Sequence, residues 1–135
     1  MSLSAQREAF TRAWQAARPP ENLRFSDWAS KHFRLVDDGS NERFRPWKFQ
    51  LGILDAMGDP LIERVSVIKA ARTGYTKSLV ATIGAFAAND PSPMMLLMPT
   101  DDDTRGIVVD EIDPAFKAIP ALRGLMVQGR MDGRN

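Results

Sequence analysis

The amino-acid sequence predicts an α/β fold in which N-terminal helices precede part of a parallel β-sheet. Two apolar runs and the segment between them support this prediction. Residues 65–68 form a β-rich run typical of a buried strand, residues 76–89 follow with a helical pattern, and residues 94–98 form a second apolar run. A strand, a helix and a strand in this order form a βαβ unit, which implies a parallel sheet with a right-handed crossover.

Three helices are expected before the first strand. Residues 4–18 are expected to form an amphipathic helix that ends at Pro19-Pro20. Residues 26–33 are expected to form a short helix with Ser26 as its N-cap, before a polar turn at residues 37–41. The apolar positions of the first helix are Ala9, Phe10, Ala13, Trp14 and Ala17.

A third helix is expected over residues 46–57, with Pro46 at its first position and Gly58-Asp59-Pro60 after its end. Its apolar stripe consists of Trp47, Leu51 and Leu54. The change from helices to the βαβ pattern divides the chain into a helical adaptor, residues 1–45, and an α/β part, residues 46–135.

The helix of the βαβ unit should end at Asp90-Pro91-Ser92-Pro93, and a further helix should run from about Thr100 to about Ile112, where Pro114 interrupts it. The expected packing face of the first of these helices is Leu79, Val80, Ile83, Phe86 and Ala87. That of the second is Ile107, Val108 and Ile112.

The composition gives no sign of a coat for nucleic acid or of a membrane protein. Eighteen Lys and Arg stand against 17 Asp and Glu in a chain of 135 residues, a formal charge of +1, and 44% of the residues are hydrophobic. Cysteine is absent, which excludes disulfides and thiolate metal sites. No stretch is apolar enough for a signal peptide or a membrane span, so a soluble intracellular protein is expected.

The strand-to-helix junction carries a sequence that compares with the phosphate-binding pattern G-x-x-x-x-G-K-[ST]. In the segment from Ala71 to Ser78 the terminal Lys-Ser pair is in register. Lys77 could therefore reach the β and γ phosphates of a nucleotide, and the Ser78 hydroxyl could ligate Mg²⁺. Ala71 and Thr76 stand where the pattern has glycine, and Gly74 lies between them, so an ordinary βα turn is the alternative.

Several other side chains are candidates for a site, each with a structural alternative. Gln50 could hydrogen-bond adenine or face solvent. Arg72 could contact a phosphate or DNA, and Tyr75 could line the nucleotide site. Alternatively, both could be loop side chains with no role in binding. His32 is the only histidine, so no cluster of histidines can bind a metal ion. Asp101-Asp102-Asp103 fits the first turn of a helix that Thr100 caps better than it fits a metal site.

The run from Val67 to Leu79 resembles the deviant Walker A segment of the lambda-type large terminase subunit of bacteriophages, the GpA family. That family tolerates a phosphate loop with a displaced glycine and a lysine at each end, which here would be Lys69 and Lys77. The resemblance covers roughly residues 22–125. Its other parts are Phe25-Ser26-Asp27-Trp28-Ala29, Trp47-Lys48-Phe49-Gln50, Leu96-Leu97-Met98-Pro99-Thr100-Asp101, Ile112-Asp113-Pro114 and Ile119-Pro120-Ala121-Leu122.

The resemblance implies a P-loop NTPase-like fold and ATP hydrolysis coupled to the packaging of double-stranded viral DNA into an empty prohead. ATP and Mg²⁺ are the implied cofactors, with Ser78 contacting Mg²⁺ that arrives with ATP. The implied nucleotide-contacting residues are Gln50, Lys69, Ala71, Arg72, Thr73, Gly74, Tyr75, Thr76, Lys77 and Ser78.

The same resemblance implies partners and a place in the cell. The partners are double-stranded DNA, a small terminase subunit, the portal of the prohead and further copies of the chain. The place is the cytoplasm of the bacterial host, where a phage or prophage would encode the chain. Family members also contain a C-terminal endonuclease. The helix of Ala9 to Ala17 is a candidate contact for the small subunit, and packing of this helix on the domain is the alternative.

One motif of such motors is not found. No apolar strand after residue 100 ends in the Asp-Glu pair that holds Mg²⁺ and polarises water, and Asp110-Glu111 lies in a helical pattern, where a solvated face is expected. The chain is therefore expected to be the N-terminal part of the ATPase domain without its Walker B strand, and to hydrolyse ATP poorly by itself. A helicase-like NTPase fragment and a degenerate, non-catalytic binding module are the alternatives.

Overall fold

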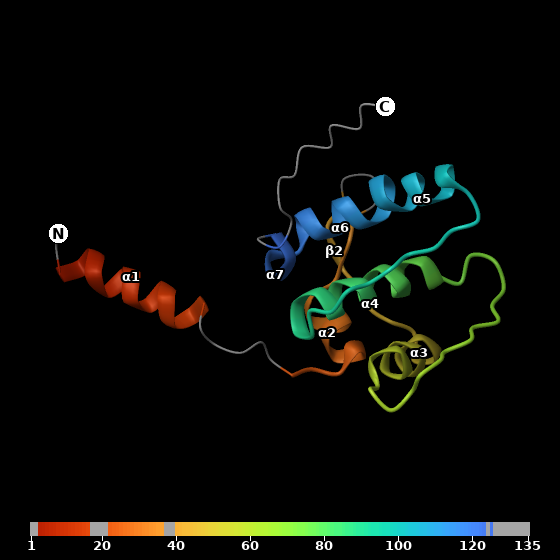
Figure 1. The fold of residues 1–135 in the computed structure, drawn as a ribbon, viewed down its shortest axis with the longest axis horizontal. Helices are drawn as coiled ribbons and strands as arrows, with labels where there is room; N and C mark the ends of the chain where they lie inside the picture. The colour runs from red at the N-terminus through yellow and green to blue at the C-terminus, as the bar shows by residue number, and fades with distance from the viewer. Residues whose placement is uncertain (1–2, 17–21, 37–39, 124, 126–135) are drawn as a thin grey trace.

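The computed structural model describes residues 3–16, 22–36, 40–123 and 125. In Figure 1, α4 lies between α2 and α3 on one side and the helix that begins with α5 on the other. The elements in chain order are α1 (Leu3–Ala16), α2 (Phe25–His32), β1 (Arg34–Leu35), β2 (Glu42–Arg43), α3 (Lys48–Gly58), α4 (Tyr75–Asn89), α5 (Asp101–Ile107), η1 (Val108–Ile112), α6 (Asp113–Ala118) and α7 (Pro120–Arg123).

The three N-terminal helices are present within one to three residues of their predicted ends, but the predicted cap of α2 is wrong. Ser26 lies inside the helix, and Arg24 takes the capping position without a side-chain bond. Asp55 of α3 supplies the missing acceptor, because its Oδ1 accepts the Ser26 N–H at 3.1 Å. A cap from another helix leaves no local sequence signal. Ala17, Pro19-Pro20 and residues 37–39 of the predicted turn lie outside the described residues.

A short antiparallel hairpin follows α2. Its strands pair Arg34 with Arg43 and Leu35 with Glu42. The pairing continues inward, where the Phe44 N–H donates to the Phe33 carbonyl at 3.1 Å and the two buried rings meet edge to face at 5.4 Å. These rings fasten the hairpin to the core, so that its outer end can take part in a cavity described below.

The core lies where α2, α3, α4, α6 and α7 meet. Trp28 is its largest fully buried side chain, with 1% of its surface exposed, and it packs against the middle of α4. A Cβ atom added at Gly84 would lie 2.9 Å from the Trp28 ring, which is too close for a side chain. The buried apolar residues are Phe25, Trp28, Ala29, Phe33, Phe44, Leu54, Val80, Ala81, Ala85, Ala115, Phe116, Ile119 and Leu122.

The predicted helix over residues 76–89 is confirmed as α4, but its predicted packing face is only partly right. The side chains that are most deeply buried are small: Ser78, Val80, Ala81, Thr82, Gly84 and Ala85. The larger predicted residues Leu79, Ile83, Phe86 and Ala87 are half-buried. Close approach of the Trp28 ring favours small residues on one face, and hydrophobicity alone could not reveal this.

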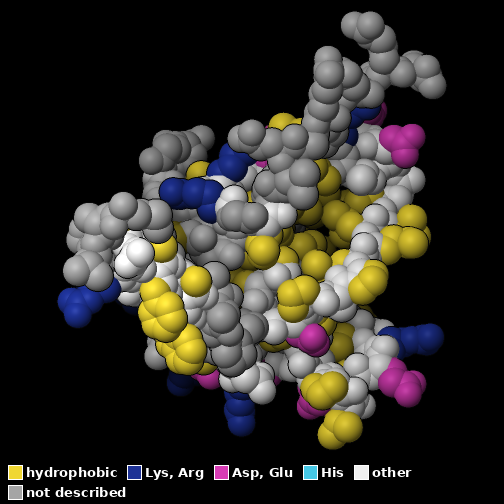
Figure 2. Space-filling view, turned by 60° about the vertical axis from the view of Figure 1, so that its left-hand side comes forward, with side chains coloured by type: hydrophobic (Ala, Val, Ile, Leu, Met, Phe, Trp, Pro, Cys, Tyr) yellow, Lys and Arg dark blue, Asp and Glu magenta, His cyan; other side chains and the backbone are white. Residues whose placement is uncertain are grey.

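The predicted parallel sheet is not formed within the described residues, where the sheet is the two-stranded antiparallel hairpin. Neither residues 65–68 nor residues 94–98 are hydrogen-bonded as strands. Their side chains alternate in exposure: Val65, Val67, Leu96 and Met98 are half-buried, whereas Ile68, Met95 and Leu97 lie almost entirely in solvent. A strand needs a partner for its backbone groups, and these two segments have no ladder partner in this part of the chain. Figure 2 shows hydrophobic side chains gathered around a hollow on one face of the molecule.

The last long helix is continuous but contains one wide turn. Thr100 caps α5 as predicted, since its Oγ1 accepts the Asp103 N–H at 3.1 Å. Instead of ending before Pro114, the chain stays helical through η1, a π-helical turn in which the Asp113 N–H donates to the Val108 carbonyl. The ring of Pro114 would clash with the carbonyl four residues earlier in a regular α-helix, and a wider turn relieves this clash.

No helix in the described ranges is both long and apolar enough to cross a membrane.

Candidate nucleotide site

The loop before α4 has an unusual backbone for residues other than glycine. Arg72 has a φ of 59° and Gly74 a φ of 70°, so two positions in three residues are left-handed. Left-handed backbone is unfavourable for an arginine and is found most often where a loop has a special task. Alternation of right-handed and left-handed residues turns successive N–H groups to one side, which is the geometry of an anion-binding nest. Such a loop directly before a helix is typical of phosphate binding.

Gln50 fastens this loop to α3. The side chain is 2% exposed, its Nε2 donates to the Thr73 carbonyl at 3.1 Å, and its Oε1 accepts the Trp47 N–H at 2.8 Å. A Cβ at Gly74 would lie 3.0 Å from the same Nε2. Both functional groups of Gln50 therefore serve the protein, and Gln50 sets the position of the loop. The predicted contact between Gln50 and adenine stays a prediction.

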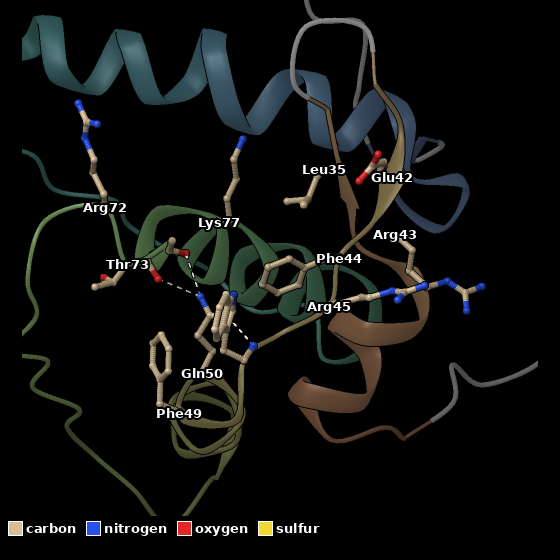
Figure 3. Close-up of a pocket in the computed structure, with 12 residues that line it drawn as sticks. Leu35, Glu42, Arg43, Phe44, Arg45, Phe49, Gln50, Arg72, Thr73 and Lys77 are labelled. Carbon is tan, nitrogen blue, oxygen red and sulfur yellow. Dashed lines mark hydrogen bonds between the residues drawn. The ribbon is translucent and has the colours of Figure 1, made fainter.

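A cavity of about 900 Å³ opens beside the loop, and Figure 3 shows how its walls come from three parts of the fold. The hairpin contributes one wall, α3 another, and the loop with the first turn of α4 the third. Its lining residues are Leu35, Glu42, Arg43, Phe44, Arg45, Trp47, Phe49, Gln50, Arg72, Thr73, Gly74 and Lys77. The cavity thus joins exposed aromatic rings at one side to cationic side chains beside a helix N-terminus at another, which suits a ligand with a flat ring and an anionic tail.

Lys77 lines this cavity, but its ammonium group is held by an ion pair. Its Nζ lies 2.7 Å from Oε2 of Glu111, and the two side chains are 21% and 25% exposed. In Figure 3 the lysine side chain extends from α4 toward the helix that contains Glu111. The predicted solvated face is therefore wrong for Glu111, which is partly buried in an ion pair, and confirmed for its neighbour Asp110, which is exposed.

Ser78 is buried on the inner face of α4, with 1% of its surface exposed. Its hydroxyl lies 3.5 Å from the Gly74 carbonyl, at the limit for a hydrogen bond. A hydroxyl that donates to a carbonyl keeps its oxygen lone pairs, so this contact does not by itself prevent binding to a metal ion. Its role as a ligand of Mg²⁺ stays a prediction.

Lys69 and Tyr75 flank the opposite side of the loop. The Lys69 Nζ lies 5.9 Å from the centre of the Tyr75 ring, within the range of a cation–π contact. Both residues line a second cavity of about 330 Å³, which is bounded mainly by apolar side chains such as Ile53 and Val67. Lys69 and Lys77 therefore lie at different cavities.

Of the remaining predicted residues, Ala71 and Thr73 belong to the loop and Thr76 lies in the first turn of α4. Ala71 and Thr76 are exposed, and the Thr73 hydroxyl donates to the Ala70 carbonyl at 3.3 Å, which closes the turn. Asp101, Asp102 and Asp103 are exposed in the first turn of α5. Among the described residues, no three His, Cys, Asp or Glu side chains come together in a way that could hold a metal ion.

Sequence reasoning did not identify the hairpin side of the cavity or the ion pair of Lys77. Arg43 and Arg45 come from a segment that was predicted only as the end of a helical adaptor. Glu111 is 34 residues from Lys77, and a pair at this separation is visible only after α4 and η1 are packed together.

Comparison with known proteins identifies relatives of this chain. It is 33% identical over 105 residues to the large terminase subunit of Enterobacteria phage P21, which covers 76% of this chain and 16% of the relative. It is 30% identical over 108 residues to the large terminase subunit of Escherichia phage lambda, which covers 78% of this chain and 17% of that relative. The chain thus spans about one sixth of the length of these curated relatives. No solved structure matches significantly.

The sequence profile of one family covers most of the chain. It describes the ATPase domain of the phage terminase large subunit gpA, and it matches residues 40–135. This chain belongs to the gpA family of phage terminase large subunits and carries part of their ATPase domain.

Proposed function

We propose that this chain carries the ATP-binding part of a motor that packages double-stranded viral DNA into proheads. The observation that carries this proposal is the position of Lys77, in the first turn of α4, directly after a loop with two left-handed residues and at the wall of a cavity of about 900 Å³. A cation, a helix N-terminus and an anion-binding loop are together the requirements of a triphosphate site.

The residues present fit the charged end of ATP. The Lys77 ammonium would meet the β and γ phosphates, and Arg72 at the same cavity would add a second positive charge. Backbone N–H groups of the loop would surround the phosphate oxygens, since the first N–H groups of a helix have no partner within it. Trp47 and Phe49, both largely exposed, would contact the base from the α3 side.

Magnesium would enter with the nucleotide. Mg²⁺ is usually held in such sites by phosphate oxygens, waters and one or two protein oxygens, so a site with few protein ligands suits it. Ser78 would supply its hydroxyl oxygen. When bound, Mg²⁺ neutralises charge on the phosphates.

We further propose that residues 65–68 and 94–98 are strands of a P-loop NTPase-like parallel sheet. Their exposed faces carry Ile68, Met95 and Leu97, and apolar residues of this kind are typical of strands buried between layers of helices. The stretch from residue 46 onward would then belong to the ATPase domain, with residues 1–45 as an adaptor. Helix α2 of the adaptor packs into the same core as α3 and α4, so the adaptor would be firmly attached to the ATPase domain.

The partners are proposed from the family. They are double-stranded DNA, a small terminase subunit, the portal of the prohead and further copies of the chain, in the cytoplasm of the bacterial host. The exposed pair of Phe10 and Trp14 on α1, whose rings stack at 6.4 Å, is the proposed contact for the small subunit. An endonuclease activity, as in the family, would require residues beyond those of the proposed site.

Titration of the chain with ATP and Mg²⁺, measured by calorimetry, tests the proposal. Saturable binding to the natural sequence is expected, and Lys77→Ala should weaken it at least about tenfold, because a charge-assisted contact contributes roughly 1.5–3 kcal/mol. Lys117→Ala is the matched control, since its side chain is 73% exposed on α6 and should leave the affinity unchanged. Equal ATP affinity of both variants would remove Lys77 from the site. Binding without hydrolysis would agree both with part of an ATPase domain and with a non-catalytic binding module, because this chain is expected to hydrolyse ATP poorly by itself.

A further inference from the structure

The ion pair between Lys77 and Glu111 links the nucleotide loop to a different helix. The Nζ and Oε2 atoms are 2.7 Å apart, and both side chains are about three-quarters buried. The pair bridges the first turn of α4 and the wide turn η1. It is also the contact that must change if Lys77 is to bind phosphate, because an ammonium held this closely by a carboxylate has to leave it, at least in part, to reach a new anion.

The location of Glu111 in a π-helical turn adds an independent observation. Such turns are rare; most of them are single wide turns inside α-helices, and they are frequent at functional sites. Here the turn is bounded by residues with ordinary helical backbone, so α5, η1 and α6 form one continuous helix of residues 101–118. The wide turn changes the direction in which its side chains point relative to a regular helix, and it places Glu111 opposite Lys77.

Electrostatics determines how Glu111 affects an anionic ligand. In a partly buried site its carboxylate attracts Lys77 and repels phosphate, and it is screened less than a fully exposed group. Asp110 on the same turn is exposed, so solvent and salt screen its charge more strongly and the charge should affect the ligand much less.

We propose that Glu111 is an internal competitor of the nucleotide for Lys77, and that displacement of Glu111 by the triphosphate transmits nucleotide occupancy to the α5–η1–α6 helix. This inference rests on the proposed function, since it assumes that Lys77 binds phosphate. Glu111 acts through Lys77 and is therefore a positioning residue. In the absence of nucleotide it holds the lysine at the cavity wall, and in its presence the carboxylate is released and the helix loses one of its attachments to α4.

Glu111→Gln tests the competition, with Asp110→Asn as the matched control that removes the same charge one residue away. ATP affinity of Glu111→Gln should rise about three- to fivefold, the change expected from the loss of a partly exposed ion pair. Its thermal midpoint should fall at the same time. Asp110→Asn should change neither quantity. If Glu111 had only a structural role, Glu111→Gln would lower both the thermal midpoint and the ATP affinity. A fall in the thermal midpoint together with a rise in ATP affinity therefore distinguishes competition from a structural role.

A second pair of measurements tests the link to the helix. In a Lys77→Ala background, Glu111→Gln should no longer raise ATP affinity, because the ammonium group for which Glu111 and the triphosphate compete is absent. Hydrogen exchange of the amides of residues 108–113 should increase when ATP is added to the natural chain, and it should be unresponsive in Glu111→Gln.

The outcomes separate this inference from the proposed function. ATP binding by the natural chain with unchanged or weaker binding by Glu111→Gln would overturn the competition and leave the nucleotide site intact. Binding by Glu111→Gln alone would support both proposals. Absence of binding in both proteins would overturn both.

Discussion

The two sides of α4 differ in how much of their packing the described residues complete. On one side, small residues of α4 meet α2 and α7, and Trp28 is 1% exposed. The packing of the two extended apolar segments, residues 65–68 and 94–98, is less complete, because their outward side chains Ile68, Met95 and Leu97 remain exposed. A helix satisfies its own backbone hydrogen bonds, whereas a strand depends on another strand. The helical core can therefore be completed by this chain, whereas an extended segment needs a partner before it can form a strand.

This difference predicts that the free energy of unfolding depends on the Trp28 side. Trp28→Ala should lower it by about 3–5 kcal/mol, because it removes the largest buried side chain and leaves a cavity against Gly84. Urea denaturation followed by circular dichroism measures the change. His32→Ala on the same helix, at a half-buried position, is the control and should cost clearly less. A loss below about 1 kcal/mol for Trp28→Ala would show that this side is not the stable core.

The same comparison explains which parts of the fold the sequence could predict. The helices could be predicted from periodicity and from stop signals such as Asp90-Pro91, because these are local properties. The residues that determine the packing face of α4 could not, since Gly84 and Ala85 are selected by the Trp28 ring of another helix. The Asp55 cap of α2 and the hairpin also depend on contacts distant in the chain.

The candidate site was predictable in part for the same reason. Lys77 and Gly74 could be found because the spacing of a phosphate loop is a local pattern. The loop position depends on Gln50, which is 23 residues from Thr73 in sequence, and the charge state around Lys77 depends on Glu111. Side chains that act through packed neighbours carry no spacing rule, so the sequence did not indicate that Gln50 holds the loop, and it predicted a solvated face for Glu111.

The loop occupies the boundary between the two sides of α4, and a substitution there should have an intermediate effect. Gly74→Ala should lower the free energy of unfolding by about 1–2 kcal/mol, because an L-residue with a φ of 70° is strained and its Cβ would press on Gln50. ATP affinity should fall as well, since the loop would move. Gly52→Ala is the control: its Cβ would meet nothing within 4 Å on α3. An equal or larger loss for Gly52→Ala would contradict the special role of the loop.

The smallest effect on the free energy of unfolding is expected at the exposed side chains of the extended segments. Ile68→Ser should change the free energy of unfolding of this chain by no more than about 0.5 kcal/mol, because the side chain is already fully exposed and leaves no cavity behind. Val80→Ser is the contrast, since Val80 is 1% exposed in the core and its loss should cost several times more. Urea denaturation of the two variants measures both. If Ile68 is a sheet residue that further strands cover, the same substitution should become strongly destabilising once those strands are present. A large effect of Ile68→Ser in this chain alone would mean that residues 65–68 already pack against a partner, and the contrast between the two sides of α4 would then be wrong.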